Sequence, residues 1–522
     1  MSDTPEITKA DARKIIDDII SGKIKDKVAL RKAKIKLSRE SSLSGIISNS
    51  KIFEHATESE KKDLGILVRK PVRTISGVAV VAVMCRPGKC PGNCIYCPDF
   101  DGAPRSYTGK EPAAMRAERM GHDPFKQVEH RLFQLGEIGH KTSKVELIVM
   151  GGTFPSEDWE YQQEFVKRCF DAMNGSCSSD LKSAQKLNET SGHRCVGLTI
   201  ETRPDFSKCE QIDRFLELGA TRVELGVQTT SDEIYKKVNR GHTVLDVIES
   251  TRQLKDAGYK VCYHYMPGLL VDAEADIKLF SALFENPDFR PDMLKMYPTL
   301  IIKGTKLYGM WKKGEYTPYD NDEAVSVIAR MKALVPSYVR IMRVQRDIPA
   351  YNIESGSSWG NLREVVAKKC SELDIKCKCI RCREAGHSLY KKNIRSVKPE
   401  IYIEKYDASE GVEFFISKED KKIGVLEGYL RMRYPSGSFR PEIDKDTAIV
   451  RELKVVGATV PVGEKGVGLQ HKGLGSELMR RAEEIAKADG KNKMVVISAV
   501  GTRKYYEKLG YAQDGPYMSK GL

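Results

Sequence analysis

Three cysteines within eight residues carry the clearest chemistry in this sequence. They lie in CPGNCIYC at Cys90, Cys94 and Cys97, a C-x3-C-x2-C spacing. Three thiolates can hold an iron–sulfur cube and leave one iron without a protein ligand, whereas a structural zinc ion takes four ligands. A zinc knuckle that uses Cys85 as its fourth ligand is the alternative. The strand-like segments that follow the motif disfavour such a short finger.

The spacing of these cysteines resembles the motif of the radical-SAM superfamily. In that superfamily the open iron of a 4Fe-4S cluster binds the amino and carboxylate groups of S-adenosylmethionine (SAM). Tyr96 stands where the superfamily places an aromatic residue beside the adenine. Gly151 and Gly152, which follow a strand-like segment, are further candidate SAM contacts.

A second group of cysteines indicates a metal site of another kind. Cys377, Cys379 and Cys382 lie within six residues. Soft ligands this close together suit tetrahedral zinc, which would be a structural ion that connects two domains. The fourth ligand is Cys370 or His387, and the spacing does not decide between them. Free buried cysteines are the alternative.

A glycine-rich motif, QHKGLG, precedes the last long helical segment and fits Q-x-x-G-x-G. Glycines let backbone amides approach a pyrophosphate, and the helix N-terminus stabilises its charge. The motif resembles the acetyl-CoA loop of GNAT acetyltransferases, and YYEKLGY resembles the segment where those enzymes place a tyrosine near the CoA sulfur. We interpret Tyr505 as a packed aromatic ring, and Glu452 as a solvated strand residue more than a general base.

Length, composition and charge limit the class of protein. The chain has 522 residues, 40% hydrophobic and 30% charged, enough for two to four domains. We expect no membrane span and no secretion, hence a cytoplasmic location, because apolar segments of about 18 residues and an apolar leader are missing from the sequence. Thirteen cysteines then indicate metal ligation more than disulfides. A net charge of +14 favours a polyanionic partner such as nucleic acid.

The elements that must position these motifs follow a repeating pattern. Six apolar, strand-like segments alternate with amphipathic ones such as Cys209–Leu218 and Val244–Ala257. The six segments are 78–84, 145–150, 196–200, 223–227, 261–265 and 293–297. The fold class is α/β: a partial (β/α)6 radical-SAM barrel with an N-terminal basic helical segment and a C-terminal GNAT α/β domain. Ligand groups belong at the C-terminal ends of the strands, where the loops converge.

The predicted domains divide the chain into four parts. They are a basic helical segment (1–70), the partial barrel (71–365), a zinc-binding linker (366–395) and the GNAT-like domain (396–522). In the last, strands are expected at 401–405, 412–417, 422–432 and 448–456, before a helix at Leu474–Ala488. The polar stretch 176–191 is expected to be a surface insertion.

Two sets of basic residues are candidate phosphate contacts. Eight lysines and arginines lie between Lys23 and Arg39, against the single Asp26. A solvated helix face and an RNA contact explain this segment about equally well. Arg340, Arg343 and Arg346 are the second set of candidates.

A radical-SAM motif joined to a GNAT motif resembles the family of the Elongator catalytic subunit, in particular its stand-alone archaeal form, over nearly the whole chain. KVELIVMGGTFP, IETRPD and VELGVQT are further marks of that family. The resemblance implies a tRNA-modifying enzyme that forms 5-carboxymethyluridine at the wobble uridine. It implies the tRNA anticodon stem-loop, acetyl-CoA and an electron donor as partners, and a homodimer is possible.

The resemblance also implies which residues act. Cys90, Cys94 and Cys97 would ligate the cluster, and Lys144 and Tyr506 would be catalytic. The residues that would bind acetyl-CoA are Lys144, Glu452, Leu453, Lys454, Val455, Gly473, Leu474, Gly475 and Tyr506. A radical from SAM would take hydrogen from the acetyl methyl group, the carbon radical would add to uracil, and thioester hydrolysis would leave the carboxymethyl group. A protein lysine acetyltransferase with a structural radical-SAM domain and an RNA-binding scaffold are the alternatives.

Overall fold

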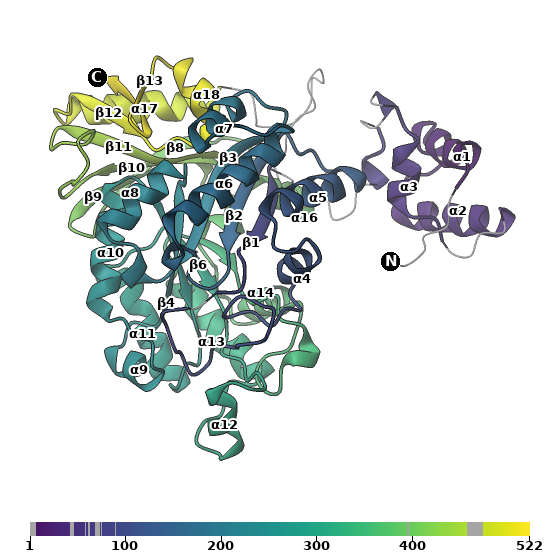
Figure 1. Ribbon diagram of the computed structural model, residues 1–522. Coiled ribbons are helices and arrows are strands. Elements are labelled where there is room, and N and C mark those ends of the chain that lie inside the picture. Colours follow the sequence, from purple (N-terminus) through teal and green to yellow (C-terminus); the bar gives the residue numbers. More distant parts are fainter. Residues whose placement is uncertain are drawn as a thin grey trace.

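The computed structural model describes residues 7–522 except 42–45, 58, 61–62, 68–73, 75, 89, 393, 395 and 457–472. Two seven-stranded sheets form the body of the molecule, and a small helical unit projects from its side (Figure 1). The helices of the N-terminal unit and the first sheet are α1 (Lys9–Ile20), α2 (Lys27–Glu40), α3 (Asn49–Glu54), α4 (Pro112–Arg119), α5 (Pro124–Glu137), α6 (Trp159–Asn174), α7 (Leu181–Asn188), α8 (Cys209–Glu217), α9 (Asp232–Lys237), α10 (Val244–Asp256), α11 (Ala273–Glu285), α12 (Lys306–Lys312) and α13 (Asn321–Leu334).

The first sheet is parallel throughout, with its strands in sequence order. Its strands are β1 (Ala79–Met84), β2 (Lys144–Met150), β3 (Arg194–Thr202), β4 (Arg222–Gln228), β5 (Lys260–Tyr265), β6 (Met293–Met296) and β7 (Arg340–Arg343). The six predicted strands are confirmed, and β7 is an addition. Helices such as α6, α8 and α10 cover the outer face (Figure 1), so the sheet forms the expected half-barrel.

The structure of the polar stretch 176–191 differs from the sequence interpretation. Instead of a surface insertion it contains α7, which packs against α6. Leu181 and Ala184 are buried, and Asn188 is fully buried, where its side-chain oxygen accepts a hydrogen bond from Cys195 N at 2.7 Å. Four inward positions at helical spacing were enough to bury one face of an otherwise polar segment.

The second sheet forms the C-terminal unit, in the order β13-β14-β12-β11-β10-β9-β8. The remaining elements are α14 (Leu362–Glu372), α15 (Ile380–Arg383), α16 (Ala385–Lys392), β8 (Glu400–Ala408), β9 (Gly411–Asp420), β10 (Val425–Tyr434), β11 (Thr447–Val455), α17 (Leu474–Ala488), β12 (Lys493–Val496), α18 (Arg503–Glu507), β13 (Ala512–Asp514) and β14 (Tyr517–Gly521). The predicted strands and the predicted helix are confirmed. β11 and β12 are parallel, whereas their outer neighbours run antiparallel.

Buried arginines join the second sheet to the first. Arg451 forms a double ion pair with Asp292 at 2.7 and 2.6 Å, and Arg433 Nε lies 2.7 Å from Asp256 Oδ1. Both arginines are fully buried, and Asp292 immediately precedes β6. The second sheet therefore covers the N-terminal ends of the barrel strands, above them in Figure 1. The loops at their C-terminal ends stay on the opposite side.

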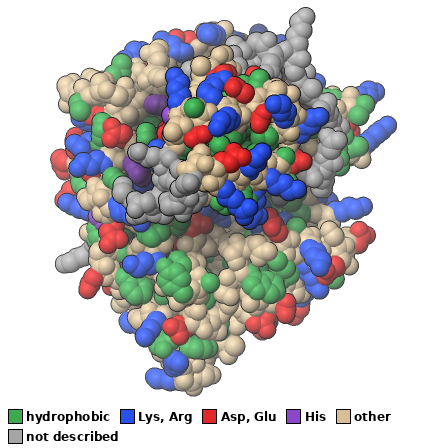
Figure 2. All heavy atoms as spheres, turned by 90° about the vertical axis from the view of Figure 1, so that its right-hand side faces the viewer, with side chains coloured by type: hydrophobic (Ala, Val, Ile, Leu, Met, Phe, Trp, Pro, Cys, Tyr) green, Lys and Arg blue, Asp and Glu red, His purple; other side chains and the backbone are tan. Residues whose placement is uncertain are grey.

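The N-terminal helices form a separate small core, which includes Ile16, Leu30 and Ile52. This unit meets the barrel through α3, which lies against α5. It faces the viewer in Figure 2, where Lys and Arg side chains are interspersed with acidic ones over its surface. In the described part of the chain, no helix has the length and apolar character that a membrane crossing requires.

Candidate functional site

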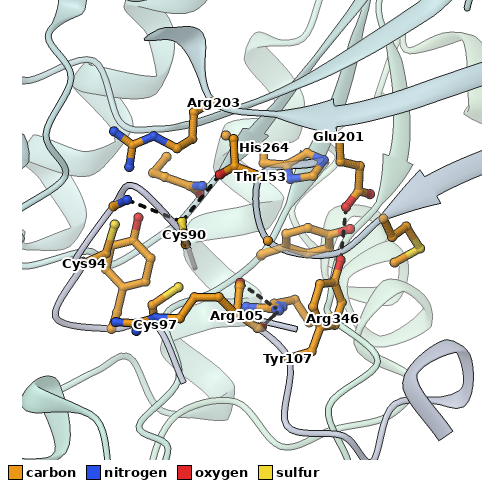
Figure 3. Close-up of a pocket in the computed structure, with 18 of the residues that line it drawn as sticks. Cys90, Cys94, Cys97, Arg105, Tyr107, Thr153, Glu201, Arg203, His264 and Arg346 are labelled. Atoms are coloured by element: carbon orange, nitrogen blue, oxygen red, sulfur yellow. Dashed lines mark hydrogen bonds between the residues drawn. The ribbon is translucent and has the colours of Figure 1, made fainter. Parts of the chain in front are cut away.

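Cys90, Cys94 and Cys97 lie on the loop that follows β1, at the C-terminal end of the barrel. Ile95, between two of them, is held from both sides: its N–H donates to Val238 O at 3.0 Å, and its carbonyl accepts from Leu307 N at 2.9 Å. Figure 3 shows the cysteines on one side of a pocket, with Tyr107 and Glu201 on the other. We call this cavity the radical pocket.

Hydrogen-bond donors surround the sulfur atoms of this loop. Arg240 Nη1 donates to Cys94 Sγ at 3.3 Å, and Gly92 N donates to Cys90 Sγ at 3.4 Å. Cys90 Sγ also lies 3.4 Å from Thr153 Oγ1. Burial and then the neighbouring Cys94 raise the pKa of Cys97 to about 11, and a bound metal would favour its thiolate form.

The donor set fits an iron–sulfur cube better than a zinc ion. These three sulfurs, all in described residues, do not all lie within 4.8 Å of one another, as the ligands of a single ion would have to. Cys85 does not complete a zinc site, because it is buried and its thiol donates to Gly151 O at 3.2 Å. Buried Arg203 Nη1 and Arg240 Nε lack hydrogen-bond partners here and can meet an anionic ligand.

The glycine turn after β2 also borders the radical pocket. Gly151 and Gly152 have φ of 112° and 55°, and a Cβ on Gly151 would lie 2.7 Å from Cys85 Sγ. Gly152 lines the pocket directly, as does the buried Tyr96. Gly92 is needed as well, since a Cβ there would lie 2.0 Å from Arg203 Nη1. The predicted SAM contacts are thus gathered around the cysteine loop.

A layer of charged side chains crosses the barrel interior beside the radical pocket, and we call it the ionic layer: Glu201, Arg222, Glu224 and Lys295. Arg222, Glu224 and Lys295 are buried, and Glu201 lines the pocket. Lys295 Nζ lies 2.8 Å from Glu201 Oε1 and also pairs with Glu224. Glu201 Oε2 accepts a hydrogen bond from Tyr107 at 3.1 Å. Burial opposes the charge of Glu224, yet Lys295 holds the pKa of this carboxyl well below its usual range. The layer was not predicted from the sequence, because inward positions of barrel strands are usually apolar.

A second cavity of about 630 Å³ lies at the other end of the barrel, between the two sheets. All nine residues predicted for acetyl-CoA line it: Lys144, Glu452, Leu453, Lys454, Val455, Gly473, Leu474, Gly475 and Tyr506. We call it the acetyl-CoA pocket. The radical pocket shares no lining residue with it, although the same barrel strands contribute to both.

The start of α17 provides the anion-binding part of the acetyl-CoA pocket. Gly473 has φ 80° and caps the helix without a side-chain hydrogen bond, so the first backbone N–H groups remain open to a ligand. A Cβ on Gly475 would lie 2.6 Å from Tyr505 Oη. Tyr505 and Tyr506 form the expected ring pair, at 5.2 Å between centroids. The preceding residues 470–472 of the motif lie outside the described residues.

Glu452 differs from its interpretation as a solvated strand residue. It is buried, and it accepts hydrogen bonds from Tyr429 Oη at 3.0 Å and Arg431 Nε at 2.9 Å. Burial opposes its charge, but the Arg431 guanidinium lowers the net pKa below the usual value. A carboxylate held in this pair is a structural anion and a poor general base.

The barrel itself contributes charged residues to the acetyl-CoA pocket that were not predicted from the sequence. Glu146, Arg222 and Lys260 point there from the N-terminal halves of three strands. Arg222 pairs with Glu146 and, at 3.3 Å, with Glu224 of the ionic layer. Burial lowers the pKa of Lys260 to about 8. The ionic layer thus separates the acetyl-CoA pocket from the radical pocket.

The second cysteine group is tighter than the first. The sulfurs of Cys377, Cys379 and Cys382 lie within 4.8 Å of one another, a spacing that fits one metal ion. Neither Cys370 nor His387 belongs to this set among the described residues, so the fourth ligand stays open. Thiol hydrogen bonds from Cys377 and then Cys379 lower the pKa of Cys382.

The three arginines proposed as phosphate contacts have different environments. Arg340 is buried on β7, and its Nε donates to Glu384 Oε1 at 2.8 Å. Its prediction as a phosphate contact is therefore wrong. Arg343 pairs with Asp347 at 2.5 Å at the pocket rim. Arg346 Nη2 donates to Ser106 O at 2.5 Å and also lines the radical pocket.

Four family models match the chain in order. They are an ELP3 N-terminal domain (residues 9–75), the Radical SAM superfamily (85–283), a Radical_SAM C-terminal domain (291–372) and an Acetyltransferase (GNAT) domain (468–521). The Radical SAM match therefore contains Cys90, Cys94 and Cys97, and the GNAT match contains Gly473, Gly475 and Tyr506 of the acetyl-CoA pocket.

Relatives of the whole chain agree with these matches. It is 51% identical to the tRNA uridine(34) acetyltransferase of Methanocaldococcus jannaschii, over 100% of this chain and 99% of that protein. It is 46% identical to Elongator complex protein 3 of Drosophila melanogaster, over 89% and 87% of the two chains. The structure of archaeal Methanocaldococcus infernus Elp3 without residues 1–46 matches with a TM-score of 0.78 and 47% identity, over 86% of this chain and 100% of that chain. The chain belongs to the Elongator complex protein 3 family.

Proposed function

We propose that this protein modifies the wobble uridine of tRNA, forming 5-carboxymethyluridine from acetyl-CoA and SAM. One observation carries the proposal: the acetyl-CoA pocket lies between the two domains, and its walls come from both of them. The names of the relatives support tRNA uridine as the substrate, since the archaeal relative is called a tRNA uridine(34) acetyltransferase. The anticodon stem-loop is the expected RNA, because specific RNA recognition usually targets unpaired loop bases.

The geometry of the acetyl-CoA pocket disfavours a lysine acetyltransferase. A protein substrate would have to bring its amine to the thioester, but Arg222, Thr199 and Lys260 of the barrel face this pocket. Glu452, the candidate base, is committed to Arg431. In the proposed reaction, which both pockets share, the acetyl group would point toward the barrel interior.

The residues of the chain position the reactants and exclude water. Cys90, Cys94 and Cys97 would hold a 4Fe-4S cluster, which supplies one-electron cleavage of SAM and hence a radical able to abstract hydrogen. Arg203 and Arg240 offer free donors to the anionic groups bound there. Buried residues such as Tyr96 and Arg203 line the radical pocket and would keep a reactive species away from bulk solvent.

The remaining predictions complete this proposal. Cys377, Cys379 and Cys382 would hold a structural zinc ion that fixes the segment between barrel and second sheet. Lys144 and Tyr506 lie in the acetyl-CoA pocket and would contact the thioester end. The electron donor, the homodimer and the cytoplasmic location stay predictions.

Anaerobic reconstitution tests the proposal directly. The protein would be loaded with iron and sulfide and incubated with tRNA, SAM, acetyl-CoA and a chemical reductant, and the digested nucleosides analysed by mass spectrometry. We expect 5-carboxymethyluridine only when both cosubstrates are present. Acetylated protein lysines without a modified nucleoside would support the lysine acetyltransferase instead.

A further inference from the structure

A separate cavity of about 500 Å³ lies beside the radical pocket, and the reaction proposed above does not use it. Segments 110–115, 298–300 and 345–362 contribute its walls, and we call it the side cavity. Arg346 and Asp347 line both the side cavity and the radical pocket. The two cavities are therefore immediate neighbours at the C-terminal end of the barrel.

Hydrogen bonds between two loops hold the side cavity in shape. Arg346 reaches the carbonyl of Ser106 at 2.5 Å, and Asn352 Nδ2 donates to Thr108 Oγ1 at 3.3 Å. Gln345 Oε1 accepts from Leu362 N at 3.0 Å, which closes the far side. One of the two loops continues from the cluster cysteines, so the side cavity has a fixed position relative to the cluster site.

The lining combines an apolar interior with cations and an exposed aromatic ring. Its apolar members are Pro112, Met115, Pro298, Leu300, Ile348, Pro349, Ala350, Ile353 and Leu362. Tyr351 lines the same cavity and is 76% exposed, an unusual exposure for a large ring without a ligand. Lys110 is exposed at the edge, and Arg346 is half-buried. The acid of this cavity, Asp347, is already paired with Arg343.

We propose that the side cavity binds one unpaired nucleobase adjacent to the target uridine. The inference rests on the proposed function, because it assigns the neighbour of a uridine that enters the radical pocket. Tyr351 offers a stacking face, and Lys110 and Arg346 offer cations to the connecting phosphates. An apolar cavity accepts the flat faces of a base, and the shared wall places consecutive nucleotides in consecutive cavities.

The test measures binding of RNA to the full chain, without cofactors. An anticodon stem-loop RNA is compared with two versions that carry an abasic residue immediately 5′ or 3′ of the target uridine. We expect Tyr351→Ala to weaken binding of the intact loop by about fivefold to a hundredfold, and Tyr351→Phe to bind nearly as well as the wild type. Tyr402→Ala, on the edge strand β8 of the other sheet, is the matched control and should bind normally.

The abasic loops identify the cause of any weaker binding. The wild-type protein should bind one of the abasic loops as weakly as Tyr351→Ala binds the intact loop. The affinity of Tyr351→Ala for that abasic loop should be no lower than the affinity of the wild type for it. Equal affinity of Tyr351→Ala and wild type for the intact loop would overturn the inference, as would a Tyr351→Ala effect of the same size on both abasic loops. In either case wild-type protein that still modifies the uridine would leave the proposed function standing.

Discussion

The radical pocket and the acetyl-CoA pocket lie at opposite ends of one barrel and are built differently. The first is formed by loops at the C-terminal strand ends, and its candidate metal ligands lie within eight consecutive residues. The second is shared by two domains, and its barrel side is formed by inward-facing charges such as Arg222 and Lys260. A local motif thus indicates the first pocket, whereas only the tertiary structure reveals both walls of the second.

Removal of one cluster ligand should have the largest effect and should be confined to the radical pocket. Cys94→Ala is expected to remove the iron–sulfur absorbance and abolish SAM cleavage, because three thiolates are the full protein ligation of the cube. Acetyl-CoA affinity, measured by calorimetry, should stay unchanged. Cys177→Ala removes an exposed cysteine instead and should retain both properties. SAM cleavage at the wild-type rate by Cys94→Ala would contradict the cluster assignment.

The converse change should affect only the acetyl-CoA pocket. Gly473→Glu places a negative charge at the start of α17 and strains a residue with φ 80°, so acetyl-CoA affinity should fall at least about tenfold. Gly473→Asn is the control, because asparagine tolerates a positive φ and adds no charge. A loss of affinity seen only in Gly473→Glu would then come from charge repulsion and not from backbone strain. Cluster absorbance should persist in both variants. If Gly473→Glu binds acetyl-CoA like the wild type, this loop does not bind the pyrophosphate.

RNA binding should depend on a surface remote from both pockets. Lys27, Arg31 and Lys32 are exposed on α2 and make no ion pair with a carboxylate among the described residues. Replacing all three with Gln should flatten the plot of log affinity against log salt by about 0.7–0.9 for each RNA phosphate that the protein no longer neutralises. Lys398, Lys421 and Lys422 are exposed lysines beside the second sheet and provide a control that removes the same amount of charge; Lys398 pairs with Glu400. An unchanged slope would make the α2 side chains a solvated helix face.

The smallest effect concerns pH and should again distinguish the two pockets. Lys260 is charged below a pKa of about 8 and neutral above it, so its attraction for anionic acetyl-CoA fades as pH rises. We expect affinity to fall about threefold to tenfold between pH 7 and pH 9. Lys260→Met should show a flatter profile, while SAM affinity follows the same pH profile in both proteins. An unaltered acetyl-CoA profile in Lys260→Met would show that this lysine does not attract the ligand.

Much of the fold could be predicted from the sequence, because its signals are local. Six strands and the helix Leu474–Ala488 have long apolar or periodic patterns. β7 has four residues with arginine at both ends, so its apolar segment is only two residues long, whereas β6 of the same length has three apolar residues. The helix α7 was missed because polar side chains such as Asn188 face inward there, toward backbone partners.

The site was predictable to a similar degree. Spacing identified both cysteine groups, and family resemblance identified residues that the structure gathers into one pocket. The ionic layer was beyond reach, since Glu224 and Lys295 are far apart in the sequence and meet only when β4 and β6 curve around a common interior. Glu452 was misjudged for the same reason: its partner Arg431 lies on the neighbouring strand.

The central claim is that an acetyl group bound at one end of the barrel reacts with a radical formed at the other. Acetyl-CoA with a deuterated methyl group, supplied to the reconstituted protein with SAM and tRNA, tests it by mass spectrometry of the released 5′-deoxyadenosine. We predict deuterium in that product for the wild type and none for Gly473→Glu. Unlabelled 5′-deoxyadenosine from wild-type protein that forms the modified uridine would contradict it.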